Sequence, residues 1–271
     1  MAPPPPRPPP TSPTPGAHLQ VASALCSIVI SCAMESIARK NTFTMAVPGG
    51  SVLKALAGLV DQPMGPAMRM DWRKVHIAYV NHRVVAEGDP KSSHAKAKDL
   101  FMDALPMFPN VATVDGTLPP GEEAERYAEM LQTMAANAKM PKDPITKLPQ
   151  FDLVLLGMGA DGHVGSLYPG EGAALEGEKM VVAQEKADGS ASITFTHALM
   201  SSTQRAVICC TGGKKAAAVA NALENLDLKP GEAPAALVKP RDLGAELTWL
   251  LDAPAASDLS LYKGMRNTAD F

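Results

Sequence analysis

The segment GMGADGHVGSLYPG, residues 157–170, contains the residues best suited to chemistry in this chain. It places His163 two residues after Asp161, in a glycine-rich turn that follows the apolar run FDLVLL. A histidine in such a turn is not expected on an apolar core face, and its ordinary pKa makes it a natural proton carrier. The aspartate can orient the ring or stabilise its charged form. The pattern therefore predicts a pair of residues for proton transfer.

Other kinds of catalytic centre find less support in the sequence. The chain contains no GxSxG segment, which disfavours a serine hydrolase of the usual kind. Asp161 and His163 have no third clustered ligand, so we expect no metal site. The glycine-rich loops match neither a Walker loop nor the GxGxxG pattern, so a nucleotide cofactor is not implied.

Two further glycine-bearing loops follow strand-like runs, namely Gly49-Gly50-Ser51 and Thr211-Gly212-Gly213-Lys214-Lys215. In an open α/β sheet, loops at the carboxyl ends of the strands collect into one crevice. Glycines there let backbone N–H groups approach a ligand, and a helix N-terminus adds partial positive charge. Each loop alone could be an ordinary tight turn. Together with Gly159 and Gly162 of the middle loop, they predict a site for a phosphate ester.

These loops need a sheet to position them, and the chain alternates strand-like with helix-like segments. Strands are expected at 43–47, 74–80, 110–114, 151–156, near 179–184, 192–196 and 205–210, and at 247–251. Helices are expected at 19–39, from Ser51, at 92–105 and 122–138, after Gly212-Gly213, and at the end of the chain. The alternation is typical of an α/β fold with a mostly parallel sheet. With no internal repeat or long linker, the sequence predicts a single domain over residues 17–271, with a Rossmann-like sheet flanked by helices.

Composition limits the ligands and partners of the chain. The net charge is −3, so there is no global basic field to attract nucleic acid or an anionic membrane. An aromatic content of 4% also argues against base-stacking surfaces. Phosphate binding must therefore be local. The four cysteines, Cys26, Cys32, Cys209 and Cys210, show no CxxC spacing, and we expect buried, reduced thiols.

The amino-terminal segment divides into a proline-rich part and an apolar part. Residues 1–16 are dominated by proline, which predicts a disordered tail through which protein partners could bind. Residues 19–37 are apolar but include Gln20 and Glu35, so we expect a helix of a globular domain and no membrane span. The cytoplasm is the expected compartment. A plastid or other organelle is the alternative, because the first 34 residues contain no acidic residue.

The segment FDLVLLGMGADGHVGSLYPG resembles the signature of the 6-phosphogluconolactonase family, FDLxLLGxGPDGHTASLFP. Residues 48–51 are similar to the family's SGGS loop, and residues 211–215 to its TGxGK turn. Residues 235–240 and 247–252 resemble its LPAxLVxP and LTWFLD segments. The motifs occur in the family's order over nearly the whole chain after the tail. The wider fold of sugar-phosphate isomerases and glucosamine-phosphate deaminases is also similar and provides a less favoured alternative.

The resemblance implies a reaction and a role for individual residues. It implies 6-phosphoglucono-δ-lactone as substrate, water as co-substrate, no metal and no organic cofactor, in the oxidative pentose phosphate pathway. His163 would be the general base that activates water and then returns the proton to the ring oxygen, and Asp161 would orient it. Arg83 and Lys215 match cationic positions of the family and would hold the phosphate or the developing oxyanion.

The chain departs from the family pattern beside Arg83. Asn81-His82-Arg83 stands where the family has Asp-Glu-Arg, Ser92-Ser93-His94 replaces Ser-(Asn or Thr)-Tyr, and Ser192 takes the place of an arginine. Without the two carboxylates, Arg83 is expected to lose orientation, which would slow turnover. Two functions therefore stay open. One is a working lactonase, and the other is a catalytically weak or inactive homologue that serves as a structural or binding subunit of a larger assembly.

Overall fold

The computed structural model describes residues 17–62 and 64–263. The predictions of a disordered tail and of partners at residues 1–16 lie outside the described residues, as does the end of the predicted domain beyond residue 263.

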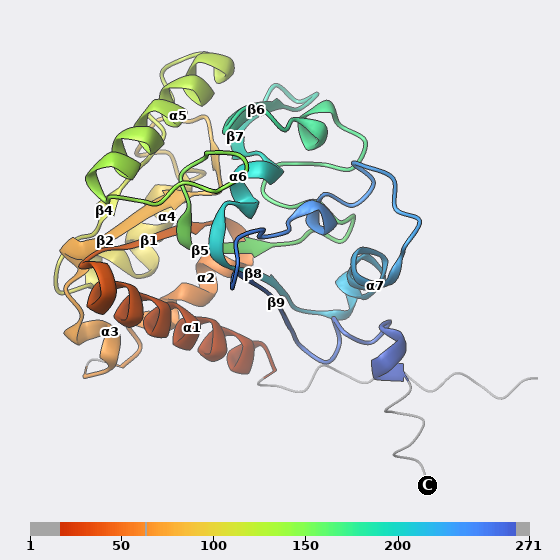
Figure 1. Ribbon diagram of the computed structural model, residues 1–271, viewed down its shortest axis with the longest axis horizontal. Coiled ribbons are helices and arrows are strands. Elements are labelled where there is room, and N and C mark those ends of the chain that lie inside the picture. Colours follow the sequence, from red (N-terminus) through yellow and green to blue (C-terminus); the bar gives the residue numbers. More distant parts are fainter. Residues whose placement is uncertain (1–16, 63, 264–271) are drawn as a thin grey trace, which may run out of the picture.

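Within the described residues, a six-stranded sheet forms the centre of the molecule, in the order β4-β2-β1-β5-β8-β9 (Figure 1). Its strands are β1 (Phe43–Val47), β2 (Val75–Tyr79), β4 (Asn110–Val111), β5 (Phe151–Gly157), β8 (Thr203–Cys210) and β9 (Glu246–Leu251). Every neighbouring pair is parallel. The expected α/β fold with a mostly parallel sheet is thus confirmed.

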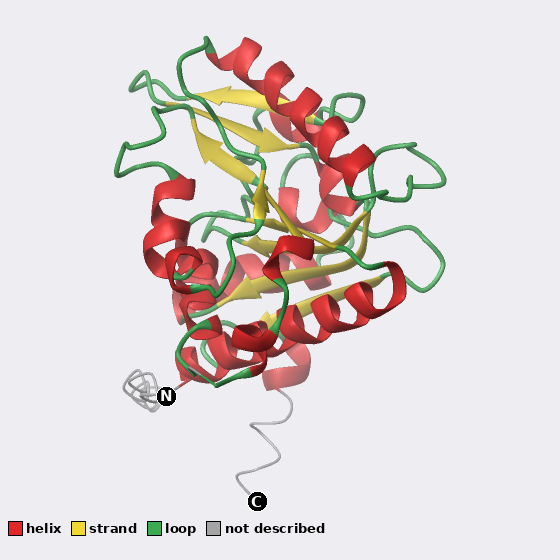
Figure 2. Cartoon of the chain, turned by 90° about the vertical axis from the view of Figure 1, so that its left-hand side faces the viewer, coloured by secondary structure: helices red, strands yellow, loops and turns green. Residues whose placement is uncertain are grey.

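Helices cover both faces of this sheet, as Figure 2 shows. One face packs against α1 (Ala17–Lys40), α2 (Gly50–Ala55), α3 (Pro66–Arg69) and α4 (Ser93–Leu100). The other packs against α5 (Pro120–Asn137), α6 (His197–Ser201) and α7 (Ala216–Glu224). Short 3₁₀ helices occupy Leu56–Leu59, Trp72–Lys74, Met102–Ala104, Gly172–Leu175, Gly213–Lys215 and Pro234–Leu237. A last helical turn begins at residue 260.

The continuous apolar run of β5 follows from this double cover. Leu153 and Leu155 belong to the core on the α1 side, whereas Val154 and Leu156 belong to the core on the α5 side. A strand buried on both faces has no position for a polar side chain that faces water, so its sequence shows no alternation. This is why the FDLVLL run could be assigned to a central strand from sequence.

A second sheet of three antiparallel strands lies beside α5 near the top of Figure 2, and two of its strands were predicted from sequence, near 179–184 and at 192–196. Its order is β3-β7-β6, with β3 at Asn81–Arg83, β7 at Ala191–Phe195 and β6 at Val181–Glu185. Val80 links the two sheets: its N–H donates to Val47 of β1 at 2.8 Å, and its carbonyl accepts from Phe195 of β7 at 2.7 Å. β3 escaped prediction because three polar residues carry no strand-like pattern.

Two predicted elements are shorter than expected. β4 has only two residues where five were expected, and the helix expected over 92–105 ends at Leu100 and continues as a 3₁₀ turn. Phe101 leaves the helical conformation, with φ −156°, and its side chain is completely buried. Burial of the ring thus accompanies the end of the helix at this point.

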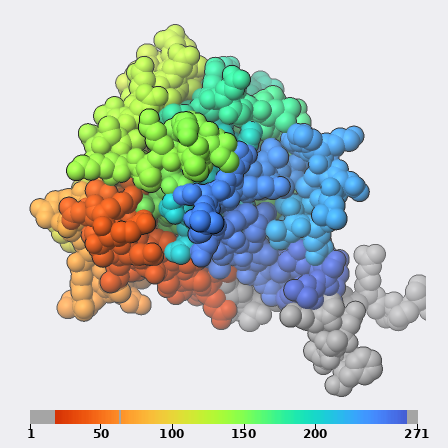
Figure 3. Space-filling model, viewed as in Figure 1, coloured from red at the N-terminus to blue at the C-terminus, as the bar shows by residue number. Residues whose placement is uncertain are grey.

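Among the described residues, α1 is the one helix that is long and apolar enough to cross a membrane. One of its faces nevertheless lies in the core, where Val21, Leu25 and Val29 are buried. Its first turn adjoins the carboxyl-terminal segment, as the red and blue regions in Figure 3 show, and His18 lies 3.6 Å from Asp252. The helix therefore contributes to the core in the way expected of a globular domain.

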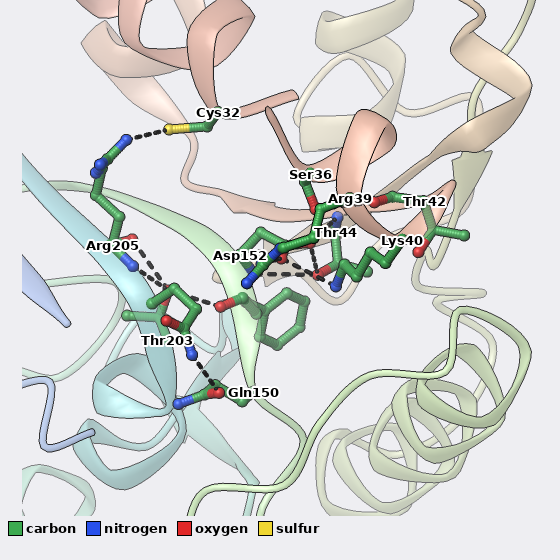
Figure 4. A network of polar contacts seen from close by, with 12 residues as sticks. Cys32, Ser36, Arg39, Lys40, Thr42, Thr44, Gln150, Asp152, Thr203 and Arg205 are labelled. Carbon is green, nitrogen blue, oxygen red and sulfur yellow. Dashed lines mark hydrogen bonds and ion pairs between the residues drawn. The ribbon is translucent and has the colours of Figure 1, made fainter. Parts of the chain in front are cut away.

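A buried carboxylate joins α1 to two strands at the amino end of the sheet (Figure 4). Asp152 Oδ2 accepts the N–H and the hydroxyl of Thr44 at 2.8 and 2.9 Å, and Thr44 Oγ1 accepts the N–H of Asp152 at 3.1 Å. Asp152 Oδ1 lies 2.9 Å from Lys40 Nζ. The carboxylate thus connects β5, β1 and the last turn of α1.

Replacing this carboxylate should destabilise the fold. Asp152→Ala leaves the Lys40 ammonium group and the Thr44 N–H without their acceptor in a buried place, so we expect the free energy of unfolding to fall by about 3 kcal/mol. Urea denaturation followed by circular dichroism measures this. Asp71→Ala removes a carboxylate whose ion pair with Arg73 is exposed, and should hardly change the midpoint. Equal losses in the two variants would contradict the assignment.

Candidate active site

A cavity of about 350 Å³ lies at the carboxyl end of the parallel sheet. The loops after β1, β5 and β8 line it, together with residues of β3, the start of α4 and the hairpin between β6 and β7. Of the residues singled out from sequence, the structure brings together in its lining Gly49, Gly50, Ser51, Arg83, Gly159, His163 and Lys215. The expected convergence of loops that are distant in the chain therefore occurs.

The side chains of Asp161 and His163 form a close pair at this cavity. Asp161 Oδ1 lies 2.7 Å from Nδ1 of the ring and also accepts the backbone N–H of His163 at 3.2 Å. Burial opposes ionisation of the Asp161 carboxyl, but these hydrogen bonds from His163 outweigh it and hold its pKa below the ordinary value. An ionised carboxylate can only accept a hydrogen bond, so Nδ1 of the ring is the donor in this contact. In the neutral imidazole the other nitrogen, Nε2, can then accept a proton.

Gly159 makes the compact turn around this pair possible. A Cβ atom at residue 159 would overlap with the His163 ring and with the Asp161 carboxylate. The Gly159 N–H donates to the His163 carbonyl at 2.8 Å, and its own carbonyl accepts the N–H of Gly162 at 3.1 Å. Gly162 has φ +90° and does not line the cavity, so it shapes the turn from behind. The loop sequence thus reflects the space that the pair needs.

An aromatic ring and a lysine complete the surroundings of His163. The ring centroids of His163 and Tyr168 are 4.8 Å apart, and the Lys186 Nζ lies 4.8 Å from the Tyr168 ring centroid. The ring of Tyr168 therefore contacts both side chains and limits the movement of the imidazole. Tyr168 was not predicted as a site residue from sequence, although it belongs to the same loop.

The charged side chains in the lining are all cationic. Besides Arg83 and Lys215, the cavity receives Lys91, Lys96 and Lys186, and no carboxylate of the described residues lines it. Sequence reasoning missed these three lysines because they lie in separate loops and in α4, where no spacing relates them. The cavity is thus a local positive region in a chain whose net charge is −3.

Asn81 joins the strand β3 to two of the loops that form the cavity. Its Oδ1 accepts the N–H of Gly49 at 3.4 Å, and its Nδ2 donates to the Gly165 carbonyl and to Ser166 Oγ, each at 3.3 Å. An ionised aspartate could accept from Gly49 but could not donate to Gly165. The amide that stands in place of the family's carboxylate therefore has a structural use of its own.

Arg83 and Lys215 differ in how they are held. Within residues 17–62 and 64–263, no hydrogen bond or ion pair engages the Arg83 guanidinium, which leaves it free to meet an anion. The Lys215 ammonium group donates to the Met158 carbonyl. The loop of Lys215 is fixed by Asp252, which accepts the N–H groups of Gly212 at 2.9 Å and of Ala255 at 2.8 Å.

Metal ligands do not gather in the part of the chain that the structure describes. No three side chains of His, Cys, Asp or Glu come together there in a metal-binding arrangement. All four cysteines are free and buried. The lining of the cavity offers an imidazole, cationic side chains and glycine-rich backbone.

Comparison with known proteins identifies relatives of the chain. The family model for glucosamine-6-phosphate isomerases and 6-phosphogluconolactonases matches residues 17–249. The chain is 36% identical over 223 residues to 6-phosphogluconolactonase 3, chloroplastic, of Arabidopsis thaliana, covering 81% of this chain and 66% of that protein. The crystal structure of the devB protein matches with 26% identity and a TM-score of 0.74, over 88% of this chain and 96% of the other. The 6-phosphogluconolactonase of Trypanosoma brucei, at 22% identity and TM-score 0.71 over 90% and 96%, shares the fold.

The space at Gly159 can be tested by filling it. Gly159→Ala should displace the His163 ring and lower the free energy of unfolding by about 1–3 kcal/mol, because overpacking forces neighbours to move. The imidazole signals of His163 in NMR spectra and urea denaturation report the two effects. Gly121→Ala in α5 is the control, since the added methyl group meets open space there. Unchanged His163 signals in the Gly159→Ala variant would show that the turn does not need glycine.

Proposed function

The chain belongs to the family of glucosamine-6-phosphate isomerases and 6-phosphogluconolactonases, and we propose that it hydrolyses 6-phospho-D-glucono-1,5-lactone to 6-phosphogluconate. The observation that carries this proposal is the Asp161–His163 pair beside a cavity whose charged lining is wholly cationic. A base suits the hydrolysis of an ester, and the cations suit a phosphorylated substrate. The reaction belongs to the oxidative pentose phosphate pathway.

The proposed reaction uses one base twice. His163 Nε2 takes a proton from water while the water oxygen attacks C1 of the lactone, and the carbonyl electrons move onto oxygen. When the tetrahedral intermediate collapses, the C1–O5 bond breaks and the ring oxygen takes the proton back from the imidazolium. Asp161 stabilises the imidazolium between the two steps. The cycle restores His163 and consumes only water, so we propose no metal and no organic cofactor.

Substrate binding is assigned to the cations and to the glycine-rich loops. We propose that Arg83 and Lys215 hold the phosphate or the developing oxyanion, and that the loop of Gly49, Gly50 and Ser51 offers backbone and hydroxyl groups to it. Gly159 leaves room for the imidazole, and Gly162 acts by shaping the turn. Lys91, Lys96 and Lys186 add to the positive potential. The cavity of about 350 Å³ suits a single phosphosugar.

The lactonase is better supported than the two other functions considered. The curated relative is named a 6-phosphogluconolactonase, which supports the lactonase over a deaminase or an isomerase. A catalytically weak subunit would be supported by a blocked or dismantled cavity. Asn81 instead lines the cavity and is held there by hydrogen bonds, and His82, outside the lining, is hydrogen-bonded to the backbone of Arg83 and His94.

Compartment and protein partners are proposals that rest on the sequence. The cytoplasm is our proposed compartment, and the chloroplastic name of the Arabidopsis relative supports the plastid as the alternative. Partners at the proline-rich residues 1–16 stay a prediction.

Removing the base should abolish most of the turnover. His163→Ala is expected to lower kcat by about 10² to 10⁴, the usual contribution of a general base. The measurement is acid release from freshly made lactone, corrected for spontaneous hydrolysis, with circular dichroism to show that the variant is folded. His197→Ala, which removes a histidine outside the cavity lining, is the control. Near-normal turnover in a folded His163→Ala variant would remove His163 from the mechanism.

Removing a cation should affect phosphorylated substrates selectively. Lys215→Ala is expected to raise KM for 6-phosphogluconolactone by about tenfold or more, since a charge-assisted contact contributes about 1.5–3 kcal/mol. Unphosphorylated gluconolactone should be handled almost as before. Lys214→Ala, at the exposed neighbouring position, should leave both substrates unaffected. An equal rise of KM for both substrates in the Lys215→Ala variant would mean that this lysine does not bind the phosphate.

A further inference from the structure

His82 is a buried imidazole in the strand β3, with 1% of its surface exposed. Its Nδ1 lies 2.7 Å from the carbonyl oxygen of Arg83, which can only accept, so this nitrogen carries the proton. Its Nε2 is therefore an acceptor, and the backbone N–H of His94 donates to it at 3.2 Å. Ser92 Oγ is also within 3.3 Å of Nε2. The ring thus bridges the backbone of β3 and the start of α4.

The start of α4 needs such an acceptor. The first N–H groups of a helix have no partner within the helix, and Ser92, Ser93 and His94 are all buried from water. Ser92 Oγ accepts the N–H of Ala95 at 3.2 Å, and His82 accepts the N–H of His94. The Ser92 hydroxyl and the His82 imidazole therefore each accept one of the backbone N–H groups of the first turn.

The two elements that His82 joins both contribute cations to the cavity. Arg83 lies on β3 and Lys96 lies on α4, and Lys91 directly precedes Ser92, the N-cap residue of that helix. Lys96 Nζ donates to the Lys91 carbonyl at 3.5 Å, so the position of α4 affects both lysines. A shift of α4 away from β3 would separate Lys91 and Lys96 from Arg83.

We propose that His82 is a positioning residue that fixes α4 against β3, and that its neutral ring thereby keeps Lys91 and Lys96 in place to bind the anionic part of the ligand. The inference rests on the proposed function only for the identity of that ligand, a phosphorylated sugar acid or its lactone. It also assigns a role to the residue that stands where the family has a glutamate.

The hydrogen-bonding chemistry of the imidazole determines which side chains could replace His82 in this role. The groups that face it are the Tyr79 ring, 5.2 Å away, and His94, Lys96 and Glu123. Burial lowers the pKa of His82 to about 4, so the ring is neutral at physiological pH. Protonation would place a second N–H against the donor N–H of His94. A glutamine amide can both donate and accept, whereas an ionised glutamate cannot donate to the Arg83 carbonyl.

Two measurements on the full chain at pH 7 test the proposal. Calorimetry gives the Kd of 6-phosphogluconate, and backbone amide hydrogen exchange reports the N–H groups of His94 and Ala95. His82→Ala should raise Kd about tenfold and accelerate both exchanges, whereas His82→Gln should stay within about threefold of the unaltered protein. His76→Ala is the control, since His76 lies near the amino end of β2 and outside the cavity lining.

The pH dependence separates positioning from a merely structural role. Between pH 6 and pH 4, Kd should rise more steeply in the unaltered protein than in His82→Gln, because only the former loses its acceptor by protonation. Should His82→Ala fail to fold, this comparison decides. Unchanged Kd and exchange in His82→Ala, or parallel pH profiles, would overturn the proposal. If the unaltered protein binds no 6-phosphogluconate, the proposed function fails, while the exchange at His94 still tests the role of His82.

Discussion

The parallel alignment of β2, β1, β5 and β8 is the constraint on which the cavity depends. These strands end at one edge of the sheet, so the loops that follow them must meet there, however far apart they lie in the chain. Burial on both faces fixes the strands, since neither face can turn to water. The sheet thus determines where Gly49, His163 and Lys215 come together, and the loops decide how their groups point.

Much of this could be predicted from local patterns. The apolar run of β5, the glycines after the strands and the spacing of Asp161 and His163 are each visible within about ten residues of sequence. Lys91, Lys96 and Lys186 were not predictable, because their proximity depends on α4 and on the second sheet. That sheet exists because the chain changes partner at Val80, a step that three polar residues in β3 do not reveal.

The departures from the family pattern show how polar groups adapt to a buried place. Asn81 and His82 each offer a donor and an acceptor where the family has carboxylates, and each uses both. A buried polar group is tolerated only when its hydrogen bonds are made, so such substitutions have to fit the surrounding donors and acceptors together. Asn81 and His82 are paired with the donors and acceptors around them. Within the described residues, no hydrogen bond or ion pair engages the Arg83 guanidinium, so it stays available to a ligand.

The central claim is that this cavity hydrolyses a phosphorylated lactone. The most direct measurement is the rate of acid release from freshly made 6-phosphogluconolactone with the purified full chain, corrected for spontaneous hydrolysis and compared with unphosphorylated gluconolactone. We predict saturable turnover that is proportional to protein concentration, with kcat/KM for the phosphorylated lactone at least about tenfold higher, the equivalent of one charge-assisted contact. Hydrolysis no faster than in buffer, or equal kcat/KM for the two lactones, would contradict it.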